Sequence, residues 1–275
     1  MHLVKAGGAK IPAIGLGTYT LKGDQCRDLV ARALDVGYRH IDTAALYENE
    51  AAVGEGLRAS TAARDEVFLT TKVWHTEIGD GALEASAEAS LKRLGLDHVD
   101  LLLIHWPNPK VPLAESIGAL NRVREIGLTR HIGVSNFTRP LLEQAISLSD
   151  APLVCNQLEY HPQLDQTPLL ATMRENNIAF VSYSPLGRGE MLSSPVVTDA
   201  ARAHGKTPGQ IILRWHVQQP GVAAIPRTAN PARLPENIDL FDFALSDAEM
   251  AAISALGAAG RRFSDYAFSP EWDSD

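Results

Sequence analysis

The chain repeats one unit, in which an amphipathic segment ends at a glycine and is followed by a short apolar run and a polar loop. The clearest copy has a helical pattern at residues 24–36, the helix-ending Gly37, a β-prone run at 38–41 and a loop that begins at Asp42. Such units form parallel sheets covered by helices, with functional groups at the C-terminal ends of the strands. The repeat therefore predicts an α/β fold.

Eight expected strands alternate with helices along nearly the whole chain. The strands are expected at residues 13–16, 38–41, 67–71, 99–104, 129–134, 153–157, 178–183 and 222–225. The helices are expected at residues 24–36, 50–59, 81–94, 112–126, 141–148, 167–176, 195–203 and 208–218. This count predicts a closed (β/α)8 barrel, or TIM barrel. Because no linker rich in Pro, Gly and Ser interrupts it, residues 1–275 are expected to form a single domain.

Glycines near the N-terminus refine this prediction. Gly7 and Gly8 separate two short alternating runs within residues 1–11, which predicts a β-hairpin that caps one end of the barrel. An open doubly wound sheet is the competing architecture, and it normally carries Gly-x-Gly-x-x-Gly after its first strand. Here Gly15 and Gly17 are followed by Thr20 at the third position, so this fingerprint is missing.

Charge and cysteine content argue against several classes of function. The 275 residues carry a net charge of −8 and no basic block, which argues against nucleic acid or an anionic membrane as a partner. Residues 1–11 contain no long apolar run, so we expect neither a signal peptide nor a membrane span there. We therefore expect a cytoplasmic protein. Cys26 and Cys155 are too few for a disulfide scaffold, and the histidines show no metal-ligand spacing, so no metal is expected.

Four reactive side chains stand at the ends of three consecutive expected strands. Asp42 and Tyr47 follow the second strand, Lys72 follows the third and His105 follows the fourth. Because parallel barrel strands end at the same rim, these side chains are expected to meet. Taken singly, they have ordinary interpretations as a helix N-cap, a surface aromatic, a solvated amine and a buried imidazole. Their joint occurrence at one rim predicts a catalytic site.

This set of groups suits proton donation to a carbonyl oxygen. A free phenol has a pKa of about 10, and the ammonium of Lys72 is expected to lower the pKa of Tyr47. Asp42 is expected to pair with Lys72 and keep it protonated. His105 is expected to direct an N–H at the substrate oxygen and stabilise its developing charge. Reduction also needs electrons, so a hydride donor is expected to bind beside the four residues.

The residues also resemble the aldo-keto reductases over nearly the whole chain. The matching motifs are Gly-Tyr-Arg-His-Ile-Asp-Thr-Ala at 37–44, Tyr-Glu-Asn-Glu at 47–50, Leu-Ile-His-Trp-Pro at 103–107, Ile-Gly-Val-Ser-Asn-Phe at 132–137 and Ile-Pro-Arg-Thr at 225–228. The ending Phe-Ser-Pro-Glu-Trp-Asp at 268–273 looks most like bacterial 2,5-diketo-D-gluconic acid reductases. The resemblance implies NADPH-dependent reduction of small aldehydes and ketones, such as methylglyoxal, keto esters or 2,5-diketo-D-gluconate, usually by a monomer.

The resemblance makes Tyr47 the general acid and implies a cofactor site in which the nicotinamide stacks on Tyr183. Ser135, Asn136 and Gln157 would hold the carboxamide. The implied cofactor residues are Gly17, Thr18, Asp42, Ser135, Asn136, Gln157, Tyr183, Ser184, Leu186, Gly187, Ile225, Arg227, Thr228, Arg233, Glu236 and Asn237. Arg227 stands where the family usually has lysine. Since arginine keeps the charge and can bind a phosphate through two N–H groups, a preference for NADPH is expected.

Aromatic residues after the strands are expected to form the substrate pocket. The expected lining residues are Tyr19, Tyr47, Trp74, His105 and Trp106. Their apolar faces suit a small carbonyl compound, although such aromatics also commonly cap a barrel core. His75, Arg261 and Arg262 are expected to favour an acidic substrate such as a keto acid or a diketo-sugar acid.

Two other functions fit parts of the pattern. A lysine at a barrel strand end is also found in Schiff-base aldolases and lyases, but pairing with Asp42 would keep Lys72 charged, which is the opposite of what a nucleophilic amine needs. A non-catalytic NADP(H)-binding sensor is the second alternative. The intact set of four reactive residues argues against the sensor.

Overall fold

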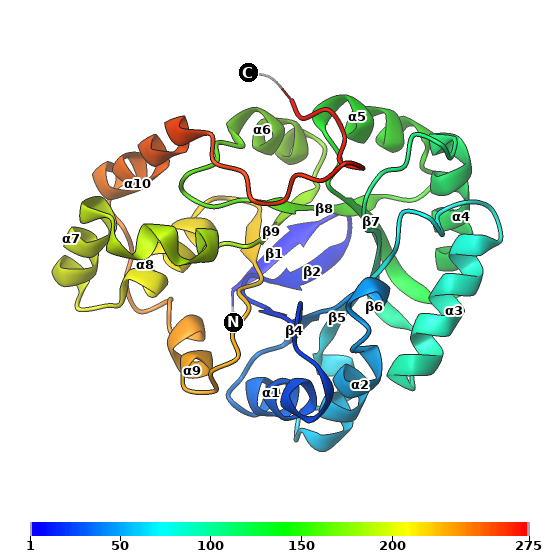
Figure 1. Cartoon of the computed structure of the whole chain (residues 1–275), viewed down its shortest axis with the longest axis horizontal. Coiled ribbons are helices and arrows are strands. Elements are labelled where there is room, and N and C mark those ends of the chain that lie inside the picture. Colours follow the sequence, from blue (N-terminus) through cyan, green and yellow to red (C-terminus); the bar gives the residue numbers. More distant parts are fainter. Residues whose placement is uncertain (1, 274–275) are drawn as a thin grey trace.

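The computed structural model describes residues 2–273 and shows a ring of parallel strands surrounded by helices (Figure 1). The strands are β3 (Leu16–Gly17), β4 (His40–Asp42), β5 (Phe68–Val73), β6 (Val99–Ile104), β7 (Thr129–Ser135), β8 (Leu153–Glu159), β9 (Ala179–Tyr183) and β10 (Val222–Ala224). They follow one another around an eight-stranded sheet in sequence order. The ends of the expected domain, residues 1, 274 and 275, lie outside the described residues.

The sheet closes where its first and last strands meet, so the predicted barrel is confirmed. A parallel bridge joins Ile14 to Ala224, and the Gly15 N–H donates to the Ala224 carbonyl at 2.9 Å. The strand expected at 13–16 is reduced to this bridge and the two-residue β3. The glycines allow close approach, because a Cβ on Gly17 would lie 2.8 Å from the Ile225 carbonyl oxygen.

The predicted N-terminal hairpin is also confirmed. Strands β1 (Leu3–Ala6) and β2 (Ala9–Pro12) pair antiparallel, and Gly7 and Gly8 make the turn with φ values of +53° and +90°. Figure 1 shows the hairpin across the centre of the barrel, seen along the shortest axis. Val4 and Ile11 are buried, so the hairpin closes one end of the core.

The helices cover the outside of the sheet and carry their apolar faces inward. They are α1 (Gly23–Asp35), α2 (Glu50–Ala59), α3 (Ala82–Leu94), α4 (Leu113–Glu125), α5 (Arg139–Leu148), α6 (Thr167–Glu175), α7 (Pro195–His204), α8 (Pro208–Gln218), α9 (Arg233–Ile238) and α10 (Asp247–Ser254). Gly37, which has a φ of +109°, follows α1. The next N–H, that of Tyr38, donates a hydrogen bond to the Ala33 carbonyl at 3.0 Å. This turn aims the next strand into the barrel.

Two helices, α9 and α10, were not predicted from the sequence. Helix α10 begins with a capping box, in which the Ser246 hydroxyl accepts the Glu249 N–H and the Glu249 side chain accepts the Ser246 N–H. This Ser-x-x-Glu signal is visible in the sequence. Helix α9 is only six residues long and contains Pro235, so its periodicity is too short to detect.

Beyond these helices, residues 260–273 form neither helix nor strand. In Figure 1 this segment, in red, leaves α10 and runs past α6 across the barrel toward β7. No helix within residues 2–273 is long and apolar enough to span a membrane.

Candidate active site

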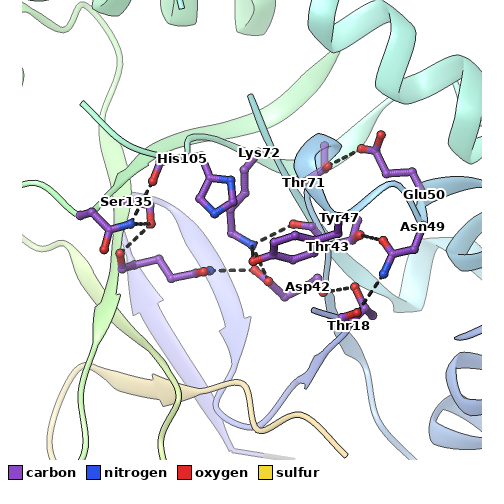
Figure 2. A network of polar contacts seen from close by, with 12 residues as sticks. Thr18, Asp42, Thr43, Tyr47, Asn49, Glu50, Thr71, Lys72, His105 and Ser135 are labelled. Atoms are coloured by element: carbon purple, nitrogen blue, oxygen red, sulfur yellow. Dashed lines mark hydrogen bonds and ion pairs between the residues drawn. The ribbon is translucent and has the colours of Figure 1, made fainter. Parts of the chain in front are cut away.

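The ends of β4, β5 and β6 bring the four expected reactive side chains to one place (Figure 2). The Lys72 Nζ lies 2.5 Å from Asp42 Oδ1, 2.8 Å from the Thr43 carbonyl oxygen and 3.3 Å from the Tyr47 hydroxyl. The Tyr47 and His105 rings meet edge to face with their centres 5.6 Å apart. Asp42 and Lys72 are both buried, with exposed fractions of 1% and 0%. The arrangement joins a buried ion pair to a phenol and an imidazole.

The second oxygen of Asp42 also has a partner. The Gln157 Nε2, which comes from the end of β8, donates to Asp42 Oδ2 at 2.7 Å. The Asp42 carbonyl accepts hydrogen bonds from the Thr18 N–H at 3.0 Å and from the Thr18 hydroxyl at 2.9 Å. The buried donors Lys72 and Gln157 thus hold the two carboxylate oxygens in one orientation, while Thr18 holds the backbone of Asp42.

Asn49 fixes the loop that carries Tyr47. Its Oδ1 accepts the Thr43 hydroxyl at 2.7 Å, and its Nδ2 donates to the carbonyls of Thr18 at 2.8 Å and Leu21 at 3.0 Å. From outside, the Lys22 ammonium donates to the Tyr47 carbonyl at 2.7 Å. The short helix at Ala45–Tyr47 is therefore tied to the loop after β3. Sequence reasoning did not identify Asn49 as an anchor.

The pKa of Tyr47 is shifted in the direction opposite to the one expected from the sequence. Burial and the negative charge of Asp42 raise the pKa of Tyr47 well above its usual value. Burial also lowers the pKa of Lys72, although Asp42 opposes this change. The cost of removing both groups from water thus exceeds the attraction that was expected to lower the phenol pKa. At neutral pH Tyr47 consequently carries its proton.

His105 is neutral for a related reason. Burial, followed by the charges of Lys72 and His75, holds the pKa of His105 well below its usual value. Within residues 2–273, its Nδ1 has no hydrogen-bond partner. A neutral imidazole has one N–H donor and one acceptor nitrogen, which suits it to orient a carbonyl compound rather than to supply a formal charge.

A cavity of about 860 Å³ opens beside Tyr47 and His105. The expected cofactor and substrate residues that line it are Gly17, Tyr19, Asp42, Tyr47, Trp74, His105, Trp106, Asn136, Gln157, Tyr183, Ser184, Leu186, Ile225 and Arg227. Lys72 does not line the cavity, and its Nζ donates to three oxygens. Those contacts disfavour a Schiff-base role, because a nucleophilic amine must be free to attack.

Several other expected cofactor residues stand behind the cavity wall. Thr18 and Ser135 are fully buried, and Gly187 is buried as well. The Ser135 hydroxyl donates to the Gln157 carbonyl at 2.8 Å, while Asn136 Oδ1 accepts the Tyr183 hydroxyl at 2.8 Å. The first contact holds the backbone of Gln157, and the second holds the Asn136 amide and the Tyr183 ring in place at the cavity.

The residues expected around the cofactor phosphate and adenine are only partly brought together. Arg227 lines the cavity and its Nε donates to the Tyr19 carbonyl at 3.2 Å. Thr228, Arg233, Glu236 and Asn237 are not among the lining residues. Arg233 and Glu236 form an ion pair of 2.8 Å on α9. This internal pair holds the Arg233 guanidinium against its own helix.

Sequence reasoning missed one wall of the cavity. Ser264, Tyr266 and Phe268, from the segment that follows α10, line it together with Leu46, Arg188 and Gly189. The Phe268 ring stacks on His75 with centres 4.7 Å apart and meets the edge of Trp74 at 5.3 Å. The aromatic residues near the C-terminus were the available signal, but they indicated only a family resemblance.

The charged groups expected to favour an acidic substrate have other contacts. His75 stacks on Phe268, and the Arg262 guanidinium lies 3.7 Å above the Trp272 ring. Arg261 pairs with Glu190 at 3.4 Å. None of these three side chains lines the cavity within the described residues. The expectation of an acidic-substrate site built from them is therefore wrong for this structure.

Known proteins match both the sequence and the fold. The sequence model of the aldo/keto reductase family matches residues 13–258. Morphine 6-dehydrogenase of Pseudomonas putida is 44% identical over 269 residues, covering 92% of this chain and 90% of the relative. The crystal structure of a candidate 2,5-diketo-D-gluconic acid reductase B has a TM-score of 0.97 at 48% identity, covering 100% of this chain and 98% of that one. The crystal structure of a Bombyx mori aldo-keto reductase in complex with NADP has a TM-score of 0.88 at 36% identity. The match covers 96% of this chain and 94% of that one.

The chain therefore belongs to the aldo-keto reductase family. It is an oxidoreductase that acts on carbonyl groups of small molecules, in a family that uses nicotinamide cofactors. The resemblance inferred from the sequence motifs is confirmed.

Proposed function

We propose that this protein reduces small aldehydes and ketones to alcohols with NADPH and that Tyr47 donates the proton. The observation that carries the proposal is the position of Tyr47, which lines the cavity and whose hydroxyl lies 3.3 Å from the Lys72 ammonium. An ordinary phenol already carries its proton at neutral pH, and burial raises the pKa of Tyr47 further, so the proton is present when a carbonyl oxygen arrives. The family membership supports the same reaction.

Each of the other three residues has a distinct part in this proposal. The Lys72 ammonium stabilises the Tyr47 oxygen as the proton leaves, and Asp42 keeps that ammonium in place through its 2.5 Å contact. His105, neutral and on the cavity, orients the carbonyl oxygen toward Tyr47. Bound NADPH would supply the hydride that the carbonyl carbon needs. The proton and hydride together convert the carbonyl to an alcohol.

The residues present fit a nicotinamide cofactor. The cavity of about 860 Å³ is within the usual range for a cofactor site, and it presents the Tyr183 ring and the amide groups of Asn136 and Gln157. At the loop after β9, Ser184 and Arg188 have left-handed backbones, with φ values of 50° and 53°. Such turns suit a phosphate because they point backbone N–H groups to one side. We infer that Arg227 binds the 2′-phosphate and gives a preference for NADPH.

Replacing Arg227 and Arg233 by glutamine should raise the Michaelis constant for NADPH by about tenfold or more, because a charge-assisted contact to phosphate is lost. The Michaelis constant for NADH, which has no 2′-phosphate, should change much less. Since Arg227 lines the cavity and Arg233 pairs with Glu236, the Arg227→Gln single variant should show most of the effect. Steady-state kinetics with both cofactors would measure it. Equal effects on the two cofactors would contradict the phosphate assignment.

The substrate class is tested by NADPH oxidation with methylglyoxal, an α-keto ester, an aromatic aldehyde and 2,5-diketo-D-gluconate. The last compound is included because of the structural match to a candidate reductase of that acid. Loss of NADPH absorbance with at least one of these carbonyls is expected. Binding of NADPH without turnover on any of them would favour the sensor function instead. The proposal takes the active form to be a cytoplasmic monomer folded as a single domain, as the sequence predicts.

A further inference from the structure

A buried carboxylate at the end of β8 holds the segment that forms the missed wall of the cavity. Glu159 is fully buried, and its Oε1 accepts the Phe263 N–H at 2.7 Å while its Oε2 accepts the Ser264 N–H at 2.7 Å. The His161 Nε2 lies 3.0 Å from Oε1. Burial alone would raise the pKa of Glu159, but the hydrogen bonds from His161 and the two backbone amides outweigh it and lower this pKa. Each carboxylate oxygen thus accepts a hydrogen bond from a backbone N–H of the C-terminal segment.

The segment held in this way reaches the substrate pocket a few residues later. Ser264, Tyr266 and Phe268 line the cavity, and the rings of Tyr266 and Phe268 stack with centres 5.3 Å apart. The edge of Phe268 meets Trp74 at 5.3 Å and Trp106 at 5.4 Å. Figure 1 shows this stretch, in red, crossing the barrel without a helix or strand of its own. Its position must therefore come from contacts with the barrel.

A few other contacts hold the beginning of the segment, and they are weaker or more exposed. The Arg261 N–H donates to the Gln163 carbonyl at 2.9 Å. The Arg188 guanidinium donates to the Phe263 carbonyl at 3.2 Å and is exposed. The two bonds to Glu159 are shorter and charge-assisted, and the bond from Ser264 is buried; charge-assisted hydrogen bonds are the stronger ones. The Phe263 ring also contacts His161, with ring centres 5.1 Å apart, but within the described residues Glu159 is the acceptor for the backbone N–H groups of both Phe263 and Ser264.

We propose that Glu159 is a positioning residue that fixes the C-terminal segment as a wall of the substrate pocket and so sets the affinity for bulky apolar carbonyl compounds. This inference rests on the proposed reductase function. A bulky aromatic aldehyde would extend from Tyr47 and His105 to the rings of Tyr266 and Phe268. Methylglyoxal is too small to use that wall. Loss of the Glu159 anchor should therefore raise the Michaelis constant for a bulky aromatic aldehyde more than that for methylglyoxal.

Glutamine at position 159 tests the anchor because it keeps the size of the side chain. Its oxygen accepts one N–H, but its NH₂ group would face the other N–H, so one hydrogen bond is lost. In Glu159→Gln we expect exchange of the Phe263 and Ser264 amide hydrogens to become about tenfold faster or more. The Michaelis constant for an aromatic aldehyde should rise by about tenfold, while that for methylglyoxal and the Kd for NADPH change less than about threefold.

Two further variants make the test independent of a folding defect. Glu175→Gln changes an exposed carboxylate at the end of α6 and should alter neither amide exchange nor substrate preference. Ser264→Pro removes the N–H that donates to Glu159 Oε2 and leaves the buried side chains of Glu159 and His161 in place. Ser264→Pro should raise the Michaelis constant for the aromatic aldehyde selectively, as Glu159→Gln does. If Glu159→Gln does not fold, Ser264→Pro can be measured in its place.

Unchanged amide exchange in Glu159→Gln would overturn the anchor. An equal rise in the Michaelis constant for large and small carbonyls would overturn its role in substrate choice. If the wild-type protein turns over no carbonyl, the proposed function fails and the inference about substrates fails with it. The exchange measurement would still decide whether Glu159 holds the segment, so the two failures can be distinguished.

Discussion

Tyr47→Phe is expected to lower kcat/KM for carbonyl reduction by about a thousandfold, while the Kd for NADPH stays nearly unchanged. General acid catalysis typically contributes factors of this size, and phenylalanine keeps the ring but has no proton to give. The ring also keeps its edge-to-face contact with His105, so the cavity should retain its shape. Steady-state turnover and fluorescence titration with NADPH would measure the two quantities separately.

Tyr160→Phe is a matched control for this substitution. Tyr160 is buried, and its hydroxyl donates to Gln219 Oε1 at 2.9 Å, away from the cavity lining. Its loss should cost about 1 kcal/mol of stability and leave kcat/KM unaltered. If Tyr47→Phe kept more than about a tenth of the wild-type kcat/KM, another group would have to donate the proton.

Lys72→Met is expected to lower the free energy of unfolding by about 3–5 kcal/mol. Asp42 would then be a buried carboxylate without its charged partner, and Gln157 supplies only a neutral hydrogen-bond donor. Breaking a buried ion pair is costly for this reason, whereas the intact pair contributes little net stability. Denaturant unfolding of the two proteins would measure the difference, and turnover should fall as well because the Tyr47 oxygen loses its stabilising charge.

The double variant Asp42→Asn with Lys72→Met tests the cause of this loss. It buries no charge, so it should be more stable than Lys72→Met alone although it carries one more substitution. Strict additivity of the two single effects would mean that Asp42 and Lys72 do not interact as a buried pair. A loss below about 1 kcal/mol in Lys72→Met would mean that water reaches Asp42.

The barrel and the meeting of the reactive residues could be predicted because both depend on local patterns. The turn at Gly37, the β-prone run after it and Asp42 at the strand end are contiguous in the sequence. Parallel strand order then brings Lys72 and His105 to the same rim, and this part of the prediction required no knowledge of loop conformation.

The parts that were missed depend on contacts between distant positions. Gln157 reaches Asp42, and Glu159 reaches Ser264, across separations of 115 and 105 residues. Neither pairing leaves a periodic signal. The direction of the Tyr47 pKa shift was also wrong, because it depends on how deeply the phenol and its neighbours are buried. A sequence gives the charge of a neighbour but not the cost of removing both groups from water.

The closure of the barrel between Ile14 and Ala224 has a consequence for folding. The two edges that meet there come from opposite ends of the chain, so the ring can be completed only after almost all of the polypeptide has been synthesised. Gly17 on one edge and Ile225 and Arg227 beyond the other also line the cavity. The cavity can thus form only late in folding. A fragment that ends before residue 222 would lack the residues that complete it.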